Sequence, residues 1–339
     1  MINYLTAILF CLAIISPYTI SAQTKLPDIY GFRHFKMIYL GDPVEILVKS
    51  KKGEENKPKP LLLFCQGSQP RPLIISFLQK GVRKIYNVFV FNTDSLVSHY
   101  HLVIIGKPFI PLTAQKDSLK NDLTYLDRSG NYPELYRRRN YPDYYVHRDI
   151  EVLQLLGKLP WVSSSKLVVA GHSEGAGIAS QIASDYPAVT ELIYACGSPL
   201  GRMISIVERS RREETDSTHL AENQFEDWRQ ICADPKNLLA EGDSNKDAFQ
   251  NSWPAPVSWL TQLKIPVLVS FGTKDQGATV GNDYLRLEAI RLKKTNFTFN
   301  GYIGLEHNFF PLTPDGKIDE EKFGWDRVAI DWNSWLKNH

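Results

Sequence analysis

The chain has 339 residues, of which 43% are hydrophobic and 12% aromatic, enough to bury one large core or two modest ones. This composition excludes a disordered chain. The formal charge of +2 comes from 39 basic and 37 acidic residues spread along the whole length, which leaves no extended basic face for a polyanion and argues against nucleic-acid binding.

The N-terminal segment, Met1 to about Ala22, has the pattern of a secretory signal peptide. An apolar stretch runs from Leu5 to Ile15, and the segment ends in Ile20-Ser21-Ala22, where a cleavage site is expected. No Lys or Arg precedes the apolar stretch, so a retained membrane anchor is the competing interpretation. Because the stretch is short for a span, we expect export to the periplasm or the medium, without stable membrane insertion once the peptide is removed.

The cysteines argue against a disulfide scaffold. After removal of the signal peptide the chain would hold Cys65, Cys196 and Cys232, an odd number at wide spacing. We therefore expect the hydrophobic core to provide the stability.

A hairpin is expected at the start of the mature chain. Two short apolar runs, 35–40 and 44–48, flank the turn residues Gly41-Asp42-Pro43. The charged stretch 50–60 contains Gly and Pro and has no periodicity, so it should be an exposed loop that leads into the next strand.

Strand and helix patterns then alternate. Four continuous apolar runs of strand length lie at 61–64, 102–105, 167–170 and 267–270, and such runs are typical of strands covered on both faces. Apolar residues recur every three or four positions within 146–157 and within 178–186, as in amphipathic helices. The alternation predicts an α/β fold with a mainly parallel sheet.

The segment from about 201 to 262 interrupts this alternation. It contains the charged run Arg209 to Glu214, several aromatic residues and Trp253-Pro254-Ala255-Pro256 near its end. We expect a helical cap insertion here. Trp228, Trp253 and Trp259 either line a pocket or pack the cap onto the sheet, and packing is the more frequent role for such residues.

A strand-to-helix turn carries the strongest chemical signal. The strand 166–170 leads directly into Gly171-His172-Ser173-Glu174-Gly175 and then into a helix pattern. A serine on such a tight turn needs small residues two positions before and after it, and Gly171 and Gly175 satisfy this. The turn also places Ser173 at a helix N-terminus, where free backbone N–H groups favour negative charge.

With these residues the chain resembles the α/β-hydrolase family, whose members carry their triad in the chain order serine, acid, histidine. Asp275 follows the predicted strand 265–271, the place expected for the acid. His307 follows the predicted strand 297–303, the place expected for the histidine. The resemblance covers nearly all of the mature chain, up to a C-terminal helix expected at about 320–336.

The resemblance implies a twisted, predominantly parallel eight-stranded sheet flanked by helices, with 23–339 as one hydrolase domain and about 201–262 as its cap. It also implies an oxyanion hole of two backbone N–H groups, that of Glu174 and one from the loop 64–70, which we assign to Ser68. Many relatives have a His-Gly pair in this loop, whereas this chain has Gln66-Gly67. Gln66 could contribute through its side chain instead.

Other polar residues are expected to be structural. His99 and His101 alternate along a predicted strand, but no third ligand accompanies them, so we predict no metal site. Glu306 and Asp243 do not directly follow a buried strand, and we expect both to be solvated.

Together these patterns predict a serine hydrolase that cleaves a carboxylic ester of a small or medium soluble substrate through an acyl-enzyme, without a cofactor. Cleavage of an amide, peptide or thioester by the same triad is the alternative. A non-catalytic binding protein on the hydrolase scaffold is a third possibility. A small-molecule substrate is the only partner that the sequence suggests, and no motif bears on the oligomeric state.

Overall fold

The computed structural model describes residues 30–86, 89–238 and 243–339. The predicted signal peptide, residues 1–22, lies outside these described residues. Within them no helix combines the length and the apolar composition that a membrane span requires.

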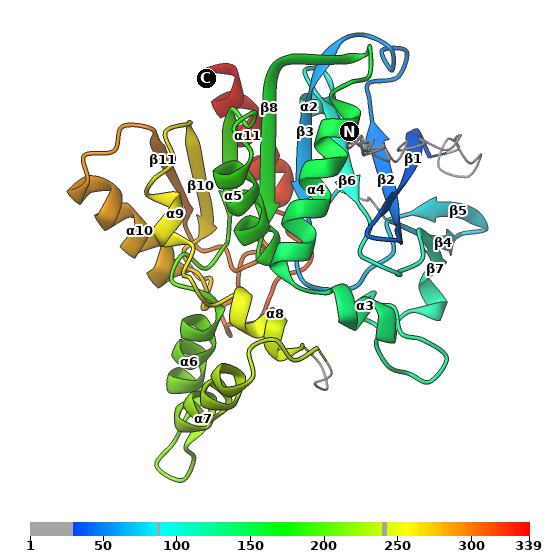
Figure 1. Ribbon diagram of the computed structural model, residues 1–339. Helices are drawn as coiled ribbons and strands as arrows, with labels where there is room; N and C mark the ends of the chain where they lie inside the picture. Colours follow the sequence, from blue (N-terminus) through cyan, green and yellow to red (C-terminus); the bar gives the residue numbers. More distant parts are fainter. Residues whose placement is uncertain (1–29, 87–88, 239–242) are drawn as a thin grey trace, which may run out of the picture.

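One eight-stranded sheet forms the centre of the molecule (Figure 1). Strand β2 runs antiparallel to both of its neighbours, and every other neighbouring pair is parallel. The predicted mainly parallel eight-stranded sheet is therefore confirmed. In spatial order the strands are β1 (Phe32–Tyr39), β2 (Asp42–Lys49), β6 (His101–Ile105), β3 (Lys59–Cys65), β8 (Val162–His172), β9 (Glu191–Ala195), β10 (Val267–Gly272) and β11 (Phe297–Tyr302).

The predicted hairpin is β1 and β2, with a tighter turn than expected. Tyr39 pairs with Asp42, so the turn consists of Leu40 and Gly41 alone, with φ angles of 50° and 85°. Two residues with positive φ make the turn type whose twist matches that of the strands. Asp42 and Pro43, expected in the turn, already belong to β2.

The apolar runs became buried strands, as predicted, but their ends differ. The loop predicted over 50–60 ends at residue 58, because Lys59 begins β3 with its buried amine bonded to the Val97 carbonyl oxygen at 2.8 Å. Strand β8 begins at Val162, about five residues before its apolar run, and Val162 pairs with Lys59 across a register shift. The four residues after Val162 are polar and at least partly exposed, so no hydrophobic pattern marks them.

Helices cover both faces of the sheet (Figure 1). Helix α5 packs on β8, β9 and α4 on one face, while α2 and α11 pack together against β6 and β10 on the other. The helices of this layer structure are α2 (Asp94–Val97), α3 (Glu134–Arg139), α4 (Pro142–Leu156), α5 (Glu174–Asp185), α10 (Thr279–Arg291) and α11 (Trp325–Lys337), with the short 3-10 helix η1 (Lys116–Ser118).

The predicted insertion, residues 201–262, is helical in its described parts. It contains α6 (Arg202–Glu213), α7 (Leu220–Ala233), α8 (Asn245–Gln250) and α9 (Val257–Leu260). Helices α6 and α7 pack on each other and project as an arm beyond the sheet (Figure 1). Two of its tryptophans pack as expected: Trp259 donates to the Ser180 hydroxyl at 2.9 Å, and Trp228 stacks on Phe249. Trp253 does neither, because it is 61% exposed and borders neither of the two cavities at the site.

A second, smaller sheet was not predicted. It contains β5 (Val82–Ile85), β4 (Ile74–Gln79) and β7 (Thr113–Gln115) in that order. Strands β4 and β5 form a hairpin, and β7 joins β4 in parallel from a distant part of the chain. The side chains of Ile75 and Tyr86 from this region border one of the two cavities at the functional site.

Candidate active site

Ser173 lies on the turn between β8 and α5, as predicted. Its backbone has φ 59° and ψ −125°, a conformation that residues other than glycine rarely adopt. The Ser173 N–H donates to the Ala195 carbonyl at 3.0 Å, and the Ser173 carbonyl accepts from the Ala176 N–H at 3.0 Å. The strained residue is thus held by β9 on one side and by the first turn of α5 on the other.

The two glycines of the turn have no room for a side chain. A Cβ atom on Gly171 would lie 1.9 Å from the Gly175 carbonyl oxygen. A Cβ atom on Gly175 would lie 2.1 Å from the Cys65 carbonyl oxygen, at the end of β3. Gly175 therefore allows both the tight turn and the close contact between α5 and the end of β3.

The structure brings the three predicted triad residues together from three separate loops. The Nε2 atom of His307 lies 2.9 Å from the Ser173 Oγ atom, and its Nδ1 atom lies 2.7 Å from Asp275 Oδ2. Because a carboxylate only accepts, Nδ1 carries the ring proton and Nε2 is free to accept the hydroxyl proton of Ser173. This is the arrangement that a general base needs toward a serine nucleophile.

Asp275 is a buried carboxylate with several donors, being 3% exposed. Its Oδ1 atom accepts from the N–H groups of Gly277 at 2.9 Å and Ala278 at 3.2 Å. Burial alone would raise the pKa of Asp275, but the hydrogen bond and the charge of His307, together with the Gly277 N–H, outweigh it, and the pKa is lowered. An ionised Asp275 can orient the ring of His307 and stabilise its positive charge.

Two further residues hold His307 in place, and sequence reasoning missed both. His172 Nε2 donates to the His307 carbonyl at 2.8 Å, and burial followed by the charge of His307 lowers the pKa of His172 to about 3. Glu306, expected to be solvated, is 8% exposed and accepts from the Asn308 N–H at 2.7 Å and the Phe310 N–H at 3.0 Å. That expectation was wrong because the turn carrying His307 leaves buried N–H groups that need an acceptor.

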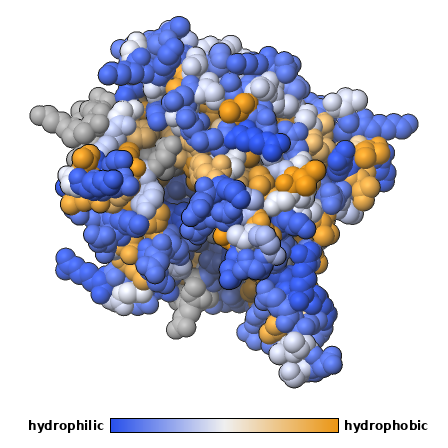
Figure 2. Space-filling view, turned by 180° about the vertical axis from the view of Figure 1, so that it is seen from behind, coloured by the Kyte–Doolittle hydropathy of each residue, from blue (hydrophilic) through white to orange (hydrophobic). Residues whose placement is uncertain are grey.

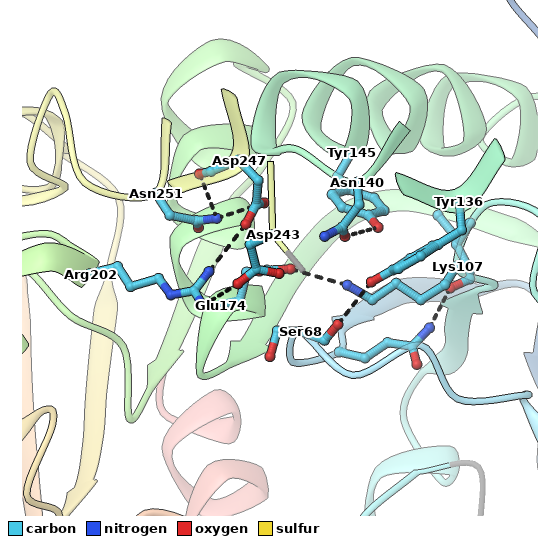
Figure 3. Close-up of polar contacts among 12 residues, drawn as sticks. Ser68, Lys107, Tyr136, Asn140, Tyr145, Glu174, Arg202, Asp243, Asp247 and Asn251 are labelled. Atoms are coloured by element: carbon cyan, nitrogen blue, oxygen red, sulfur yellow. Dashed lines mark hydrogen bonds and ion pairs between the residues drawn. The ribbon is translucent and has the colours of Figure 1, made fainter. Parts of the chain in front are cut away.

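The loop predicted to complete the oxyanion hole lies against Ser173. A Cβ atom on Gly67 would be 3.6 Å from that of Ser173, and Ser68 borders the same cavities as Ser173. The Gln66 amide donates to the Ile105 carbonyl at 2.7 Å, so this side chain anchors the loop, and Gln66 also borders the smaller cavity. Tyr136 donates to the Ser68 carbonyl at 3.2 Å and fixes the loop from the other side (Figure 3).

A buried ion pair fixes the start of α5. Lys107 Nζ lies 3.1 Å from Glu174 Oε1, and the side chains are 3% and 6% exposed (Figure 3). The Lys107 amine also lies 4.4 Å from the ring centre of Tyr145. The other carboxylate oxygen of Glu174 is buried and has no partner among the described residues. Since the N–H of Glu174 is the other predicted oxyanion donor, this pair positions a residue of the site.

A second charged cluster joins α6 to α8 (Figure 3). Arg202 pairs with Asp243 and with Asp247, the latter at 3.1 Å. Asp247 is fully buried and also accepts from the Asn251 amide at 3.0 Å. Burial, and then the charges of Glu174 and Asp243, raise the pKa of Asp247. Asp243 is exposed, as expected, but it is engaged by Arg202.

His99 and His101, considered above as metal ligands, do not lie on one strand. Strand β6 begins at His101, so His99 lies in the preceding turn and the predicted alternation was wrong. His101 is held by the Ser50 hydroxyl at 2.7 Å and the Lys57 carbonyl at 3.0 Å. Across the described ranges one group, His172, Cys196 and His307, has ligand atoms within 4.8 Å of one another. A metal there would compete for His307 with its two hydrogen-bond partners.

Two cavities meet at Ser173. One, of about 580 Å³, lies on the cap side and is bordered by polar residues of α6 and of the loop after β10. The other, of about 370 Å³, lies between the 66–73 loop, the small sheet and Trp325. Ser68, Ser173 and His307 border both cavities, so a carbonyl carbon bound at Ser173 has room for a group on either side.

A buried hydroxyl of a residue that borders the cap-side cavity lacks a partner. Tyr194 is fully buried, and its hydroxyl has no hydrogen-bond partner among the described residues. Burial raises the pKa of Tyr194, so the phenol stays protonated.

Comparison with known proteins identifies the fold. No protein-family model matches the sequence, and no curated protein matches it. Solved structures match the fold: the acylaminoacyl peptidase of Pyrococcus horikoshii (12% identity, TM-score 0.54, 91% of this chain), Est1E of Butyrivibrio proteoclasticus (14%, 0.51, 90%) and acetyl xylan esterase 1 of Thermoanaerobacterium (13%, 0.50, 93%). This chain spans 40%, 98% and 86% of those chains, respectively. It has the α/β-hydrolase fold.

Proposed function

We propose that this protein is a serine hydrolase that cleaves a carboxylic ester of a small or medium soluble substrate. The observation that carries the proposal is the hydrogen-bonded chain from Ser173 through His307 to Asp275 at the meeting point of two cavities. The fold adds support, because its neighbours include an acetyl xylan esterase and an acylaminoacyl peptidase.

In the proposed reaction, His307 Nε2 accepts the proton of Ser173 as Oγ attacks the carbonyl carbon of the ester. The N–H groups of Glu174 and Ser68 stabilise the oxyanion, each contributing about 3 kcal/mol in sites of this kind. His307 then donates its proton to the leaving alcohol, and an acyl-enzyme remains. Water, deprotonated by His307, attacks the acyl carbon and releases the acid and Ser173.

The surroundings of the site support a soluble substrate. Polar side chains such as Ser198, Ser205 and Asn251 border the cap-side cavity. Side chains over the projecting α6–α7 arm are mainly hydrophilic in Figure 2, unlike an oily lid. Amide and thioester substrates use the same acyl-enzyme steps and remain the alternative.

The proposal is tested by labelling the purified protein with a fluorophosphonate probe and by measuring hydrolysis of short p-nitrophenyl esters. We expect both reactions, and we expect Ser173→Ala to abolish them, whereas Ser165→Ala, an exposed serine at the other end of β8, should retain them. A panel of matched esters, thioesters and aminoacyl anilides then identifies the bond cleaved. Absence of labelling in a folded protein would favour the non-catalytic binding scaffold.

We further propose that the enzyme acts outside the cytoplasm, on the basis of the leader pattern in residues 1–22. Expression of the full chain followed by N-terminal mass spectrometry of the exported protein tests this. We expect a mature N-terminus close to Gln23. An uncleaved chain with Met1 in the cytoplasmic fraction would contradict the proposal, whereas intact Met1 in the membrane fraction would support a retained anchor.

A further inference from the structure

The charged side chains of the cap-side cavity point to the class of substrate. Six of them border this cavity: the carboxylates Glu174, Asp275 and Glu306 and the cations Arg202, Arg209 and Lys274. Whether the cavity prefers a charged substrate depends on which of these charges already have partners inside the protein.

Each carboxylate is already engaged. Glu174 is neutralised by Lys107 at 3.1 Å, and Asp275 binds His307 at 2.7 Å. Glu306 accepts two backbone N–H groups of its own turn. Glu174 is therefore neutralised, whereas Asp275 and Glu306 keep their negative charge but direct it at His307 and at backbone N–H groups within the protein.

One of the cations is engaged as well. Arg202 lies between Asp243 and Asp247, and Asn251 supports the buried Asp247 (Figure 3). This guanidinium joins α6 to α8, and its charge is balanced within the cap.

The other two cations have no acidic partner. Arg209 on α6 and Lys274 in the loop after β10 are both exposed, and neither forms an ion pair or a side-chain hydrogen bond with any part of the chain that the structure describes. Neighbours on α6 behave differently, since Arg211 and Arg212 both pair with glutamates. These two cations border the same cavity from different elements, Arg209 from α6 and Lys274 from the loop after β10.

The cavity therefore has two cations, Arg209 and Lys274, that have no partner among the described residues, which suits an oxygen-rich anionic group.

We propose that the ester substrate of this site carries a carboxylate group, which occupies the cap-side cavity and is attracted by Arg209 and Lys274. This inference rests on the proposed hydrolase function and narrows its substrate class. The carboxylate could belong to the acyl group or to the alcohol, so both placements are included in the test.

The test uses two pairs of esters, each differing by one charge. The first pair is 4-nitrophenyl hydrogen adipate and 4-nitrophenyl hexanoate, with the carboxylate on the acyl side. The second is 4-acetoxybenzoate and its methyl ester, with the carboxylate on the leaving group. The measured quantity is the ratio of kcat/KM for the charged ester to that for its neutral counterpart, in the wild type and in Arg209→Gln/Lys274→Gln.

In at least one pair we expect this ratio to fall on the order of tenfold in the double variant at low ionic strength, since each exposed charge pair contributes roughly two- to fivefold. A charge-reversed Arg209→Glu/Lys274→Glu variant should lower it further, and 0.5 M salt should reduce the wild-type ratio. Arg212→Gln on the same helix, outside the cavity, is the matched control and should leave the ratio unchanged.

The two proposals fail in different ways. If the wild type hydrolyses the neutral esters but the double variant has the wild-type kcat/KM ratio for both ester pairs, the carboxylate inference is wrong. The hydrolase proposal then stands. If no ester is hydrolysed and the fluorophosphonate probe does not label Ser173, the hydrolase proposal is wrong and the inference falls with it.

Discussion

Replacing Gly175 by alanine should damage the site without touching any group that takes part in the chemistry. The new Cβ atom would lie 2.1 Å from the Cys65 carbonyl oxygen and 2.6 Å from that of Gln66. Both atoms belong to the backbone, so no side chain can rotate away. The end of β3, and with it the loop that carries Ser68, must separate from α5.

The size of the effect follows from that separation. An ordinary contact between a methyl carbon and a carbonyl oxygen needs more than 3 Å, so the two segments must move apart by roughly 1 Å. Overpacking of this kind lowers the free energy of unfolding by about 1–3 kcal/mol. The higher helix propensity of alanine relative to glycine offsets roughly 0.5–1 kcal/mol of this loss. A 1 Å displacement of the oxyanion donor relative to Ser173 lowers kcat by about 10²-fold.

The assay combines urea unfolding with hydrolysis of a p-nitrophenyl ester. Gly177→Ala is the matched control, because Gly177 lies two residues further along the same helix and its Cβ atom would meet nothing within 4 Å. We expect this control to be as stable as the wild type or more stable, with kcat near the wild-type value. The reasoning is refuted if Gly175→Ala matches Gly177→Ala in both stability and kcat.

Three further predictions concern the groups around the triad. Asp275→Asn should lower kcat by about 10³–10⁴-fold, because the neutral amide neither fixes the tautomer of His307 nor stabilises its charge. An unchanged urea midpoint would show that the variant is folded. Lys107→Met should reduce the free energy of unfolding in urea by roughly 3–5 kcal/mol, since it leaves the buried Glu174 carboxylate without a cation. The double variant Lys107→Met/Glu174→Gln should recover most of this loss. If it does not, the ion-pair explanation is wrong. The pKa of His172 is 6.5 in the unfolded chain and about 3 in the folded protein, so between these values the unfolded chain binds the extra proton. The contribution of neutral His172 to the free energy of unfolding is therefore complete above pH 6.5. It falls by about 1.4 kcal/mol per pH unit as the pH drops toward 3. Urea unfolding at pH 7.5, 5.5 and 4.5 should therefore show a shallower acid loss for His172→Gln than for the wild type; equal slopes would refute this.

Patterns of a few residues were sufficient to predict the frame of the fold. The four apolar runs became central strands, and the run Gly171 to Gly175 became the turn between β8 and α5. The resemblance to the α/β-hydrolase family implied that Asp275 and His307 follow β10 and β11, and the structure brings both side chains to Ser173. No such pattern marked the small sheet, whose β7 is only three residues long and joins β4 from a distance in the chain.

The sequence by itself determined the turn from Gly171 to Gly175, because backbone geometry at a turn depends on residues within two positions of it. The expected order of serine, acid and histidine came from the resemblance to the α/β-hydrolase family. Only the tertiary structure decided which polar groups support them. Lys107 meets Glu174 across 67 positions, and His172 meets the His307 backbone across 135, and no local spacing encodes either contact. The free charges of Arg209 and Lys274 are likewise a property of the packed cavity, because a charge is uncompensated only with respect to the neighbours that folding places around it.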